Sequence, residues 1–186
     1  MSFTPTLTTY AISLHFPPEV NEIISSAVKS ISELTGNTFI LEKKIPPHVT
    51  IGAFHAAKED EAKLIQMVED FSKNQAAGLV QFSGIGDFNK KVLFLKPEKN
   101  EFLSKINSEL HSILLPEFEK AENGYYLPEI WFPHTTLATR LNQSHFSKAQ
   151  EIAKQIPLPL EAVVSEIAVY QCSPFAELKR FLISKG

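Results

Sequence analysis

The hydrophobic positions of this chain change their period several times, and these changes divide it into predicted strands and helices. Residues 10–16 are short, apolar and partly alternating, which is typical of a strand, and two prolines end the run. Residues 19–34 place apolar side chains at the spacing of one helix face, and Gly36-Asn37 follows as a C-terminal stop. The sequence therefore opens with a strand and an amphipathic helix.

The same reasoning predicts the remaining elements. Helices are expected at residues 59–73 and 100–115, and from Ser144, as the cap, to about residue 156; strands are expected at 39–41, 48–54, 79–88, 91–95, 131–141, 162–170 and 178–184. Helices come singly between strands and hairpins, without the regular alternation of a doubly wound parallel sheet. This order favours an α+β fold with largely antiparallel sheets.

Length and composition fit an ordinary globular protein. The 186 residues are enough for a real core, and we treat 1–186 as one domain with two closely packed lobes. Hydrophobic residues make up 44% and charged residues 21% of the chain. The net charge of −3 argues against broad non-specific binding to nucleic acid, but it allows a small nucleotide or an RNA end gripped locally.

Cysteine usage and the N-terminus bear on the compartment. Cys172 is the only cysteine, which excludes an intramolecular disulfide and a cysteine metal cluster. The N-terminus has no charged leader followed by a long apolar core, and no run approaches the ~20 apolar residues of a membrane-spanning helix. We expect a cytoplasmic monomer with no membrane partner.

Two segments of the chain share the pattern Pro-His-x-Thr-aliphatic, and both are predicted strands. They are PHVTI at residues 47–51 and PHTTL at residues 133–137. Side chains two apart on a strand share a face, so His48 and Thr50 are expected to point one way while their neighbours point into a core. His134 and Thr136 repeat the arrangement. If the two strands lie side by side, four polar side chains meet in one small site.

Such a set of side chains suits the cleavage of a phosphodiester. Histidine titrates near pH ~6.5, so one imidazole of a pair can be neutral while the other is protonated. The neutral ring accepts a proton from the attacking water or ribose hydroxyl, and the protonated ring gives one to the departing oxygen. Each role is typically worth about 10²–10⁴-fold in rate. Threonine hydroxyls can donate hydrogen bonds to the phosphate oxygens.

The paired His-x-Thr strands resemble the 2H phosphoesterase superfamily, which includes bacterial 2′–5′ RNA ligase-like proteins and 2′,3′-cyclic nucleotide phosphodiesterases. The segments ISLHFPPEV and EIAVYQC are also similar to the first and a late strand of that family. The resemblance implies two lobes related by a pseudo-two-fold axis, with a central cleft between them. It implies His48 and His134 as acid and base, with Thr50 and Thr136 as donors to phosphate oxygens. The substrates would be 2′,3′-cyclic phosphates, opened to 2′-phosphates with no metal and no cofactor.

Several further residues are candidates for binding substrate. Many family members carry an arginine where this chain has Thr139; Arg140 follows, and strand parity would place it on the His134 face. Phe132 is expected to stack on a base, as aromatic side chains do in nucleic-acid sites. Tyr126 belongs to a Gly- and Tyr-containing stretch, residues 116–128, and the sequence leaves open whether this stretch is a mobile flap that closes over the site. Tyr10 on the first strand is the remaining candidate.

Other interpretations remain open. His15, His55, His111 and His145 are expected to be structural, and Trp131 is expected in the core. A metal site on the motif histidines is disfavoured because neither motif contains an acidic residue and no HExxH pattern occurs. The alternatives to a cyclic phosphodiesterase are 2′–5′ RNA ligation at the same site and a nucleotide-binding or sensing module without turnover. The near symmetry of the motifs does not tell which histidine is the acid.

Overall fold

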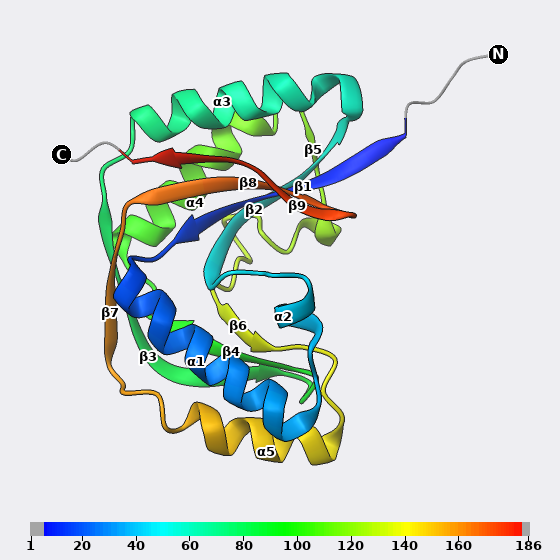
Figure 1. The fold of residues 1–186 in the computed structure, drawn as a ribbon. Helices are drawn as coiled ribbons and strands as arrows, with labels where there is room; N and C mark the ends of the chain where they lie inside the picture. The colour runs from blue at the N-terminus through cyan, green and yellow to red at the C-terminus, as the bar shows by residue number, and fades with distance from the viewer. Residues whose placement is uncertain (1–5, 184–186) are drawn as a thin grey trace.

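Two antiparallel sheets form the two lobes of the molecule (Figure 1). The computed structural model describes residues 6–183; the predicted end of the last strand, Ser184, lies outside the described residues, as do the first five residues of the N-terminal segment. The five-stranded sheet has the order β5-β2-β1-β8-β9, and the four-stranded sheet has the order β6-β4-β3-β7. All recorded strand pairs are antiparallel, which confirms the expected α+β class.

The elements have the following bounds. The five-stranded sheet contains β1 (Leu7–His15), β2 (His48–Ala57), β5 (Glu119–Lys120), β8 (Glu166–Cys172) and β9 (Phe175–Leu182). The four-stranded sheet contains β3 (Gly78–Phe88), β4 (Val92–Pro97), β6 (Thr135–Ala138) and β7 (Leu160–Val164). The helices are α1 (Pro18–Thr35), α2 (Phe39–Glu42), α3 (Glu61–Lys73), α4 (Glu101–Leu114) and α5 (Gln143–Ala153), with 3₁₀ turns η1 (Lys58–Asp60) and η2 (Glu122–Gly124).

Two helices, α1 and α4, each pack on the lobe opposite to the one that contains the preceding strand. Helix α1 follows β1 of the five-stranded sheet, yet it packs on α5 and β6 of the other lobe. Helix α4 follows β4 of the four-stranded sheet, yet it packs on β2 and on α3 (Figure 1). Neither lobe is therefore built from one continuous half of the chain. None of the helices in residues 6–183 is long and apolar enough to cross a bilayer.

The predicted helix ends follow from local chemistry. Pro18 begins α1, where its missing N–H costs nothing, and Gly36 ends the helix in the left-handed conformation at φ 70°. Asn100 caps α4 by accepting a hydrogen bond from the backbone N–H of Leu103. The fourth long helix, α5, begins at Gln143, because the side chain of Asn142 accepts from the N–H of His145. The prediction of Ser144 as its cap was wrong.

Three predicted strands differ from the structure. Residues 39–41 belong to α2, where Thr38 donates to the Glu42 carboxylate one helical turn on; three residues are too few for a period to show. The strand expected at 131–141 is only β6, because Pro133 has no N–H to donate and Arg140 takes a positive φ of 58°. The strand expected at 162–170 is divided between β7 and β8 near Ser165, where the chain passes from one sheet to the other without a Gly or Pro signal.

A buried amide attaches the segment after α4 to the strand that carries the first motif. Asn107 on α4 is fully buried, and its Nδ2 donates to the carbonyl oxygen of Ile51 at 2.8 Å and to that of Tyr126 at 2.9 Å. The backbone N–H of Ala121 donates to Ala53 of β2 at 2.9 Å. These bonds anchor the 116–128 segment against β2, which argues against the mobile flap that the sequence left open.

Replacing Asn107 with leucine should destabilise the fold. One buried and one partly buried carbonyl lose their donor, which should cost roughly 2–4 kcal/mol in the free energy of unfolding measured with urea. Asn74→Ala is the matched control, because Asn74 is exposed and its amide donates to Asp70 in solvent; it should change the same quantity by less than about 0.5 kcal/mol. Equal effects of both variants would contradict the anchoring role.

Candidate active site

The two motifs have the same local backbone irregularity. His48 is the first residue of β2, and His134 immediately precedes β6. In β2 the pairing with β1 skips Ile51, and in β6 the pairing with β4 skips Leu137. Each bulge therefore falls at the fifth position of Pro-His-x-Thr-aliphatic, just after the histidine and threonine. This repetition supports the pseudo-two-fold relation that the sequence implies.

Each motif histidine donates a hydrogen bond to the backbone two residues before it. His48 Nδ1 lies 2.8 Å from the carbonyl oxygen of Pro46, and His134 Nδ1 lies 2.9 Å from that of Phe132. A carbonyl oxygen only accepts, so Nδ1 of each ring carries a proton. In the neutral rings, Nε2 is then the free basic nitrogen. The two histidines thus have the same tautomer for the same reason.

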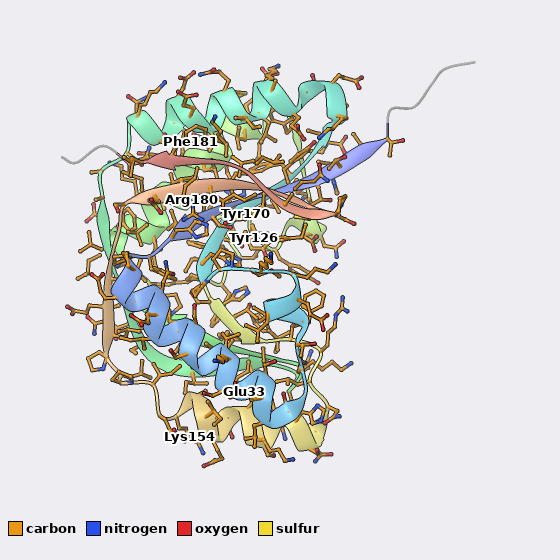
Figure 2. All side chains as sticks on the ribbon, in the orientation of Figure 1. Glu33, Tyr126, Lys154, Tyr170, Arg180 and Phe181 are labelled. Carbon is orange, nitrogen blue, oxygen red and sulfur yellow. The ribbon has the colours of Figure 1, made fainter. Side chains whose placement is uncertain are left out.

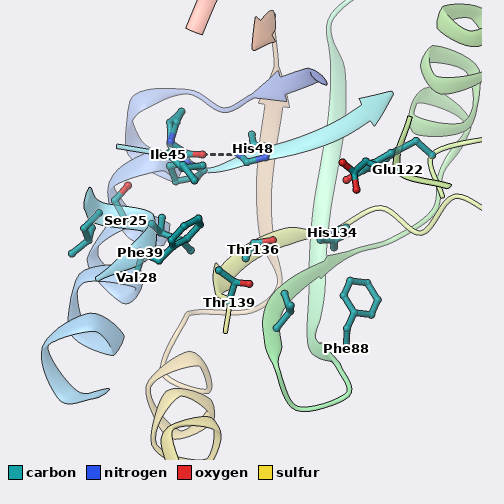
Figure 3. Close-up of a pocket in the computed structure, with 16 residues that line it drawn as sticks. Ser25, Val28, Phe39, Ile45, His48, Phe88, Glu122, His134, Thr136 and Thr139 are labelled. Carbon is teal, nitrogen blue, oxygen red and sulfur yellow. Dashed lines mark hydrogen bonds between the residues drawn. The ribbon is translucent and has the colours of Figure 1, made fainter. Parts of the chain in front are cut away.

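Both histidines line one cavity of about 500 Å³. Thr136, Thr139 and Tyr126 line it as well, and Phe39 with other apolar side chains of α1 and α2 forms a wall (Figure 3). The lobes meet here directly, because the hydroxyl of Thr135 donates to the carbonyl of His48 at 2.9 Å. The convergence expected of His48, His134 and Thr136 is present, although their strands belong to different sheets.

Two other predicted residues, Thr50 and Phe132, do not line this cavity but lie next to it. Thr50 lies beside it, with its Oγ1 3.3 Å from Ser13 Oγ and a hydrogen bond to the Tyr126 side chain. Phe132 lines an adjoining cavity of about 510 Å³ that shares His134 and Tyr126 with the first.

Two of the predicted binding residues do not line the cavity. Arg140 is exposed and does not follow strand parity, because β6 ends at Ala138; its guanidinium lies 4.0 Å from the centre of the Phe39 ring. Tyr10 is fully buried, and its hydroxyl donates to Glu61 of α3 at 2.9 Å. The interpretation of Tyr10 as a substrate-binding residue was wrong, since its ring belongs to the core of the five-stranded lobe.

A polar network lies behind His48. The ring of His15, its cross-strand neighbour, is 6.1 Å away and almost fully buried. His15 Nε2 lies 3.2 Å from Tyr170 Oη, and that hydroxyl gives its only proton to Glu177 at 2.6 Å. His15 must then donate from Nε2. Burial, with the charges of His48 and Arg180, lowers the pKa of His15 to about 3.

Arg180 connects this network to two carboxylates on the same sheet. Arg180 lies next to Tyr170 and donates to its hydroxyl at 3.2 Å (Figure 2). It also donates to Glu177 from Nε and a terminal nitrogen, and to Glu166 at 2.9 Å. The hydrogen bond from Arg180 is the largest cause that lowers the pKa of Glu177 to about 2, and partial burial opposes this shift. The far side of His48 therefore carries an arginine that is paired with two carboxylates.

His134 has different surroundings. Its ring packs edge-on against Phe88, at 5.1 Å between centroids, and at a tilt against Phe94, at 5.3 Å. Phe88 and Phe94 are 4.5 Å apart, and Phe132 packs on both. Burial lowers the pKa of both motif histidines, and for His48 the nearby charge of His134 lowers it further, while the backbone hydrogen bonds partly oppose the shift.

Sequence reasoning did not find several residues that line the cavity. Three of them lie at the ends of separate elements and belong to no recognisable motif: Glu122 begins η2, Phe88 ends β3 and Phe39 begins α2. Tyr170 and Arg180 lie on strands whose pattern indicates only alternation. The YAISLHF strand and the PHVTI motif are the signals that could have placed His15 next to His48, had their pairing been known.

The chain has clear relatives in fold and family. A family model described as the 2′-5′ RNA ligase superfamily matches residues 22–173. The chain therefore belongs to the 2′-5′ RNA ligase superfamily, whose members are 2H phosphoesterases. A search of curated proteins found no match.

Solved structures agree with this fold. Escherichia coli LigT in complex with 3′-AMP aligns with a TM-score of 0.64 at 17% identity, over 97% of this chain and 100% of that one. The protein TT0787 of Thermus thermophilus aligns with a TM-score of 0.62 at 18% identity, over 95% and 98%. Usb1 of Kluyveromyces marxianus aligns with a TM-score of 0.51 at 11% identity, over 94% and 98%.

Nitrogen-15 NMR of the histidine rings should reveal the tautomers and the lowered pKa values. His48 and His134 should carry their neutral-form proton on Nδ1 and should titrate below pH ~6.5. His15 should carry its proton on Nε2 and stay neutral down to about pH 5, since its pKa is about 3. Signals are assigned with single His→Gln variants. A neutral His48 or His134 protonated on Nε2 would contradict the hydrogen-bond assignment.

Proposed function

We propose that this protein hydrolyses 2′,3′-cyclic phosphates on nucleotides or RNA ends to 2′-phosphates, using His48 and His134 without a metal ion. The observation that carries the proposal is the matched pair of histidines, each with Nδ1 held by a backbone carbonyl, on the wall of one cavity. Membership of a 2H phosphoesterase superfamily supports the reaction class.

The reaction needs one base and one acid on opposite sides of the phosphorus. A neutral imidazole accepts a proton at Nε2 from water as the water oxygen bonds to phosphorus. The other imidazole, protonated, gives its Nε2 proton to the ribose 3′ oxygen as the bond from phosphorus to that oxygen breaks. The product keeps the phosphate on the 2′ oxygen, and a second proton exchange with solvent restores the pair.

The phosphate oxygens need donors as charge develops on them. Thr136 lines the cavity beside His134 and can donate its hydroxyl proton. Thr50 is hydrogen-bonded to Tyr126, so we assign the donation on that side to the Thr50–Tyr126 pair. Burial raises the pKa of Tyr126 to about 12, which keeps its hydroxyl protonated and able to donate at neutral pH.

A small substrate fits the site better than a long RNA. The cavity volume of about 500 Å³ is within the range of small-molecule sites. No lysine or arginine is among the described residues that line it or the adjoining cavity, whereas long nucleic acids are held by many such contacts. Structures of LigT in complex with 3′-AMP, ATP and NADP⁺ are among the similar ones, and these ligands support the nucleotide class for this chain too.

Replacing either motif histidine should remove activity without unfolding the protein. With 2′,3′-cyclic nucleotides in EDTA, His48→Ala and His134→Ala should each lower kcat by about 10²–10⁴-fold, because each loses one proton transfer. The measurement is release of the 2′-phosphate, with circular dichroism as the check on folding.

The matched control is His145→Ala, since His145 lies on α5 and does not line the cavity. It should keep the turnover of the wild type. Near-normal turnover in both motif variants would refute the two-histidine mechanism, and loss of wild-type turnover in EDTA would refute its independence of metal.

A further inference from the structure

The cavity with the two histidines continues into the adjoining cavity on the His134 side. The second cavity shares Phe88, Glu122, Tyr126 and His134 with the first. Its remaining walls include large side chains that are strongly exposed: Tyr125 is 65%, Ile130 is 59% and Phe132 is 41% accessible. Exposed aromatic faces beside a phosphate site are suited to the flat face of a nucleobase.

Glu122 is the charged side chain at the junction of these cavities. Among the described residues that line either cavity it is the one Asp, Glu, Lys or Arg, and its carboxylate forms no ion pair or hydrogen bond with another described side chain. A carboxylate repels a phosphate, so it does not serve to hold the anionic end of the substrate. Glu122 is exposed, so water solvates its carboxylate in the free protein, and a ligand in the cavity can replace this water with its own N–H or O–H donors.

The backbone holds this carboxylate toward the cleft at a conformational cost. Glu122 and Asn123 have positive φ values of 50° and 53°, which side chains other than glycine rarely adopt. The turn is fixed to β2 by the bond from the N–H of Ala121 to Ala53. Figure 3 shows Glu122 on one side of His48 and His134, with Phe39 on the other.

We expect Glu122 to contact the nucleobase of the substrate and not to take part in the proton transfers. Its charge adds to the burial that raises the pKa of Tyr126 and that of Cys172, whereas burial and the backbone hydrogen bond govern His134. The carboxylate therefore lies near Tyr126, and both residues line the two cavities.

The nucleobases offer a carboxylate different sets of donors. Guanine presents N1–H and N2–H side by side, which match the two oxygens of one carboxylate. Adenine and cytosine present one amino group beside a ring nitrogen that accepts, and that lone pair faces the second carboxylate oxygen. Uracil presents one N–H between two carbonyl oxygens. Guanine therefore gains two charge-assisted hydrogen bonds where each other base gains at most one without repulsion.

We propose that Glu122 is a specificity-determining residue that accepts the N1–H and N2–H of guanine, so that the protein prefers guanine nucleotides. The inference rests on the proposed function for the identity of the site, and it adds the base that the site selects. A bidentate contact of this kind discriminates between bases by roughly ten- to hundredfold.

The test is the base preference of the wild type and of Glu122→Gln. Glutamine keeps the size of the side chain but replaces one acceptor by a donor. In the wild type, kcat/KM for 2′,3′-cyclic GMP should exceed that for the cyclic AMP, CMP and UMP esters by roughly tenfold or more. In Glu122→Gln the ratio of the cyclic GMP value to the cyclic UMP value should fall toward one.

Glu119→Gln is the control, because Glu119 lies on β5 in the same segment and lines neither cavity. It should preserve the guanine preference. Equal kcat/KM for the four bases in the wild type, or an equal loss for all four in Glu122→Gln, would overturn the proposal.

Calorimetry separates this proposal from the proposed hydrolysis. Guanosine 2′-monophosphate should bind the wild type roughly tenfold or more tightly than uridine 2′-monophosphate, and Glu122→Gln should remove most of that difference. This result would support base selection even if no cyclic phosphate were hydrolysed. Equal affinities for the two nucleotides, or no binding of either, would overturn it whatever the outcome of the activity assay.

Discussion

The hydrogen bond from each motif histidine to the carbonyl two residues earlier is the interaction on which the site depends. It holds the ring of His48 against Pro46 and that of His134 against Phe132, and it leaves Nε2 of each as the reactive nitrogen. The proline before each histidine has no backbone N–H. The short loop that supplies the accepting carbonyl therefore needs no hydrogen-bond partner from a neighbouring strand at the proline. The repeated motif therefore sets the same tautomer, with the proton on Nδ1, in both histidines.

The two Nε2 atoms can act on one substrate only if the two lobes are held together. Three carbonyls of β2 accept hydrogen bonds from side chains elsewhere in the molecule: Thr135 donates to His48, the Trp131 indole donates to Thr50, and Asn107 donates to Ile51 at the bulge. Helices α1 and α4 also hold the lobes together, because each follows a strand of one lobe and packs on the other. The distance between the histidines is thus governed by buried hydrogen bonds.

The two halves of the site resemble each other in backbone and differ in surroundings. His48 stands before a polar network that includes His15 and Tyr170, whereas His134 stands among phenylalanines. The aromatic side continues into the cavity where Glu122 lies. The two similar histidine motifs thus lie beside one asymmetric, aromatic side, which the proposed selection of a base would use.

The sequence predicted the features that depend on local periodicity and on the repeated motif. The α+β class, the long helices and the convergence of His48, His134 and Thr136 all followed from patterns within a few residues. The sequence did not predict the passage between sheets near Ser165, the position of Arg140 after a positive φ, or the burial of Tyr10, because each depends on tertiary packing. Glu122 was missed for the same reason, since its role depends on which residues the fold places around it.

The pH dependence of kcat/KM for a 2′,3′-cyclic nucleotide, measured in EDTA from about pH 4 to 9, tests the central claim most directly. It reports the ionisation of the free enzyme. Two histidines of lowered pKa, one needed neutral and one needed protonated, predict a bell-shaped profile with its maximum at or below pH ~6.5. A rate that rises with pH and stays level to pH 9 would contradict the account, because no group would then be needed in its protonated form.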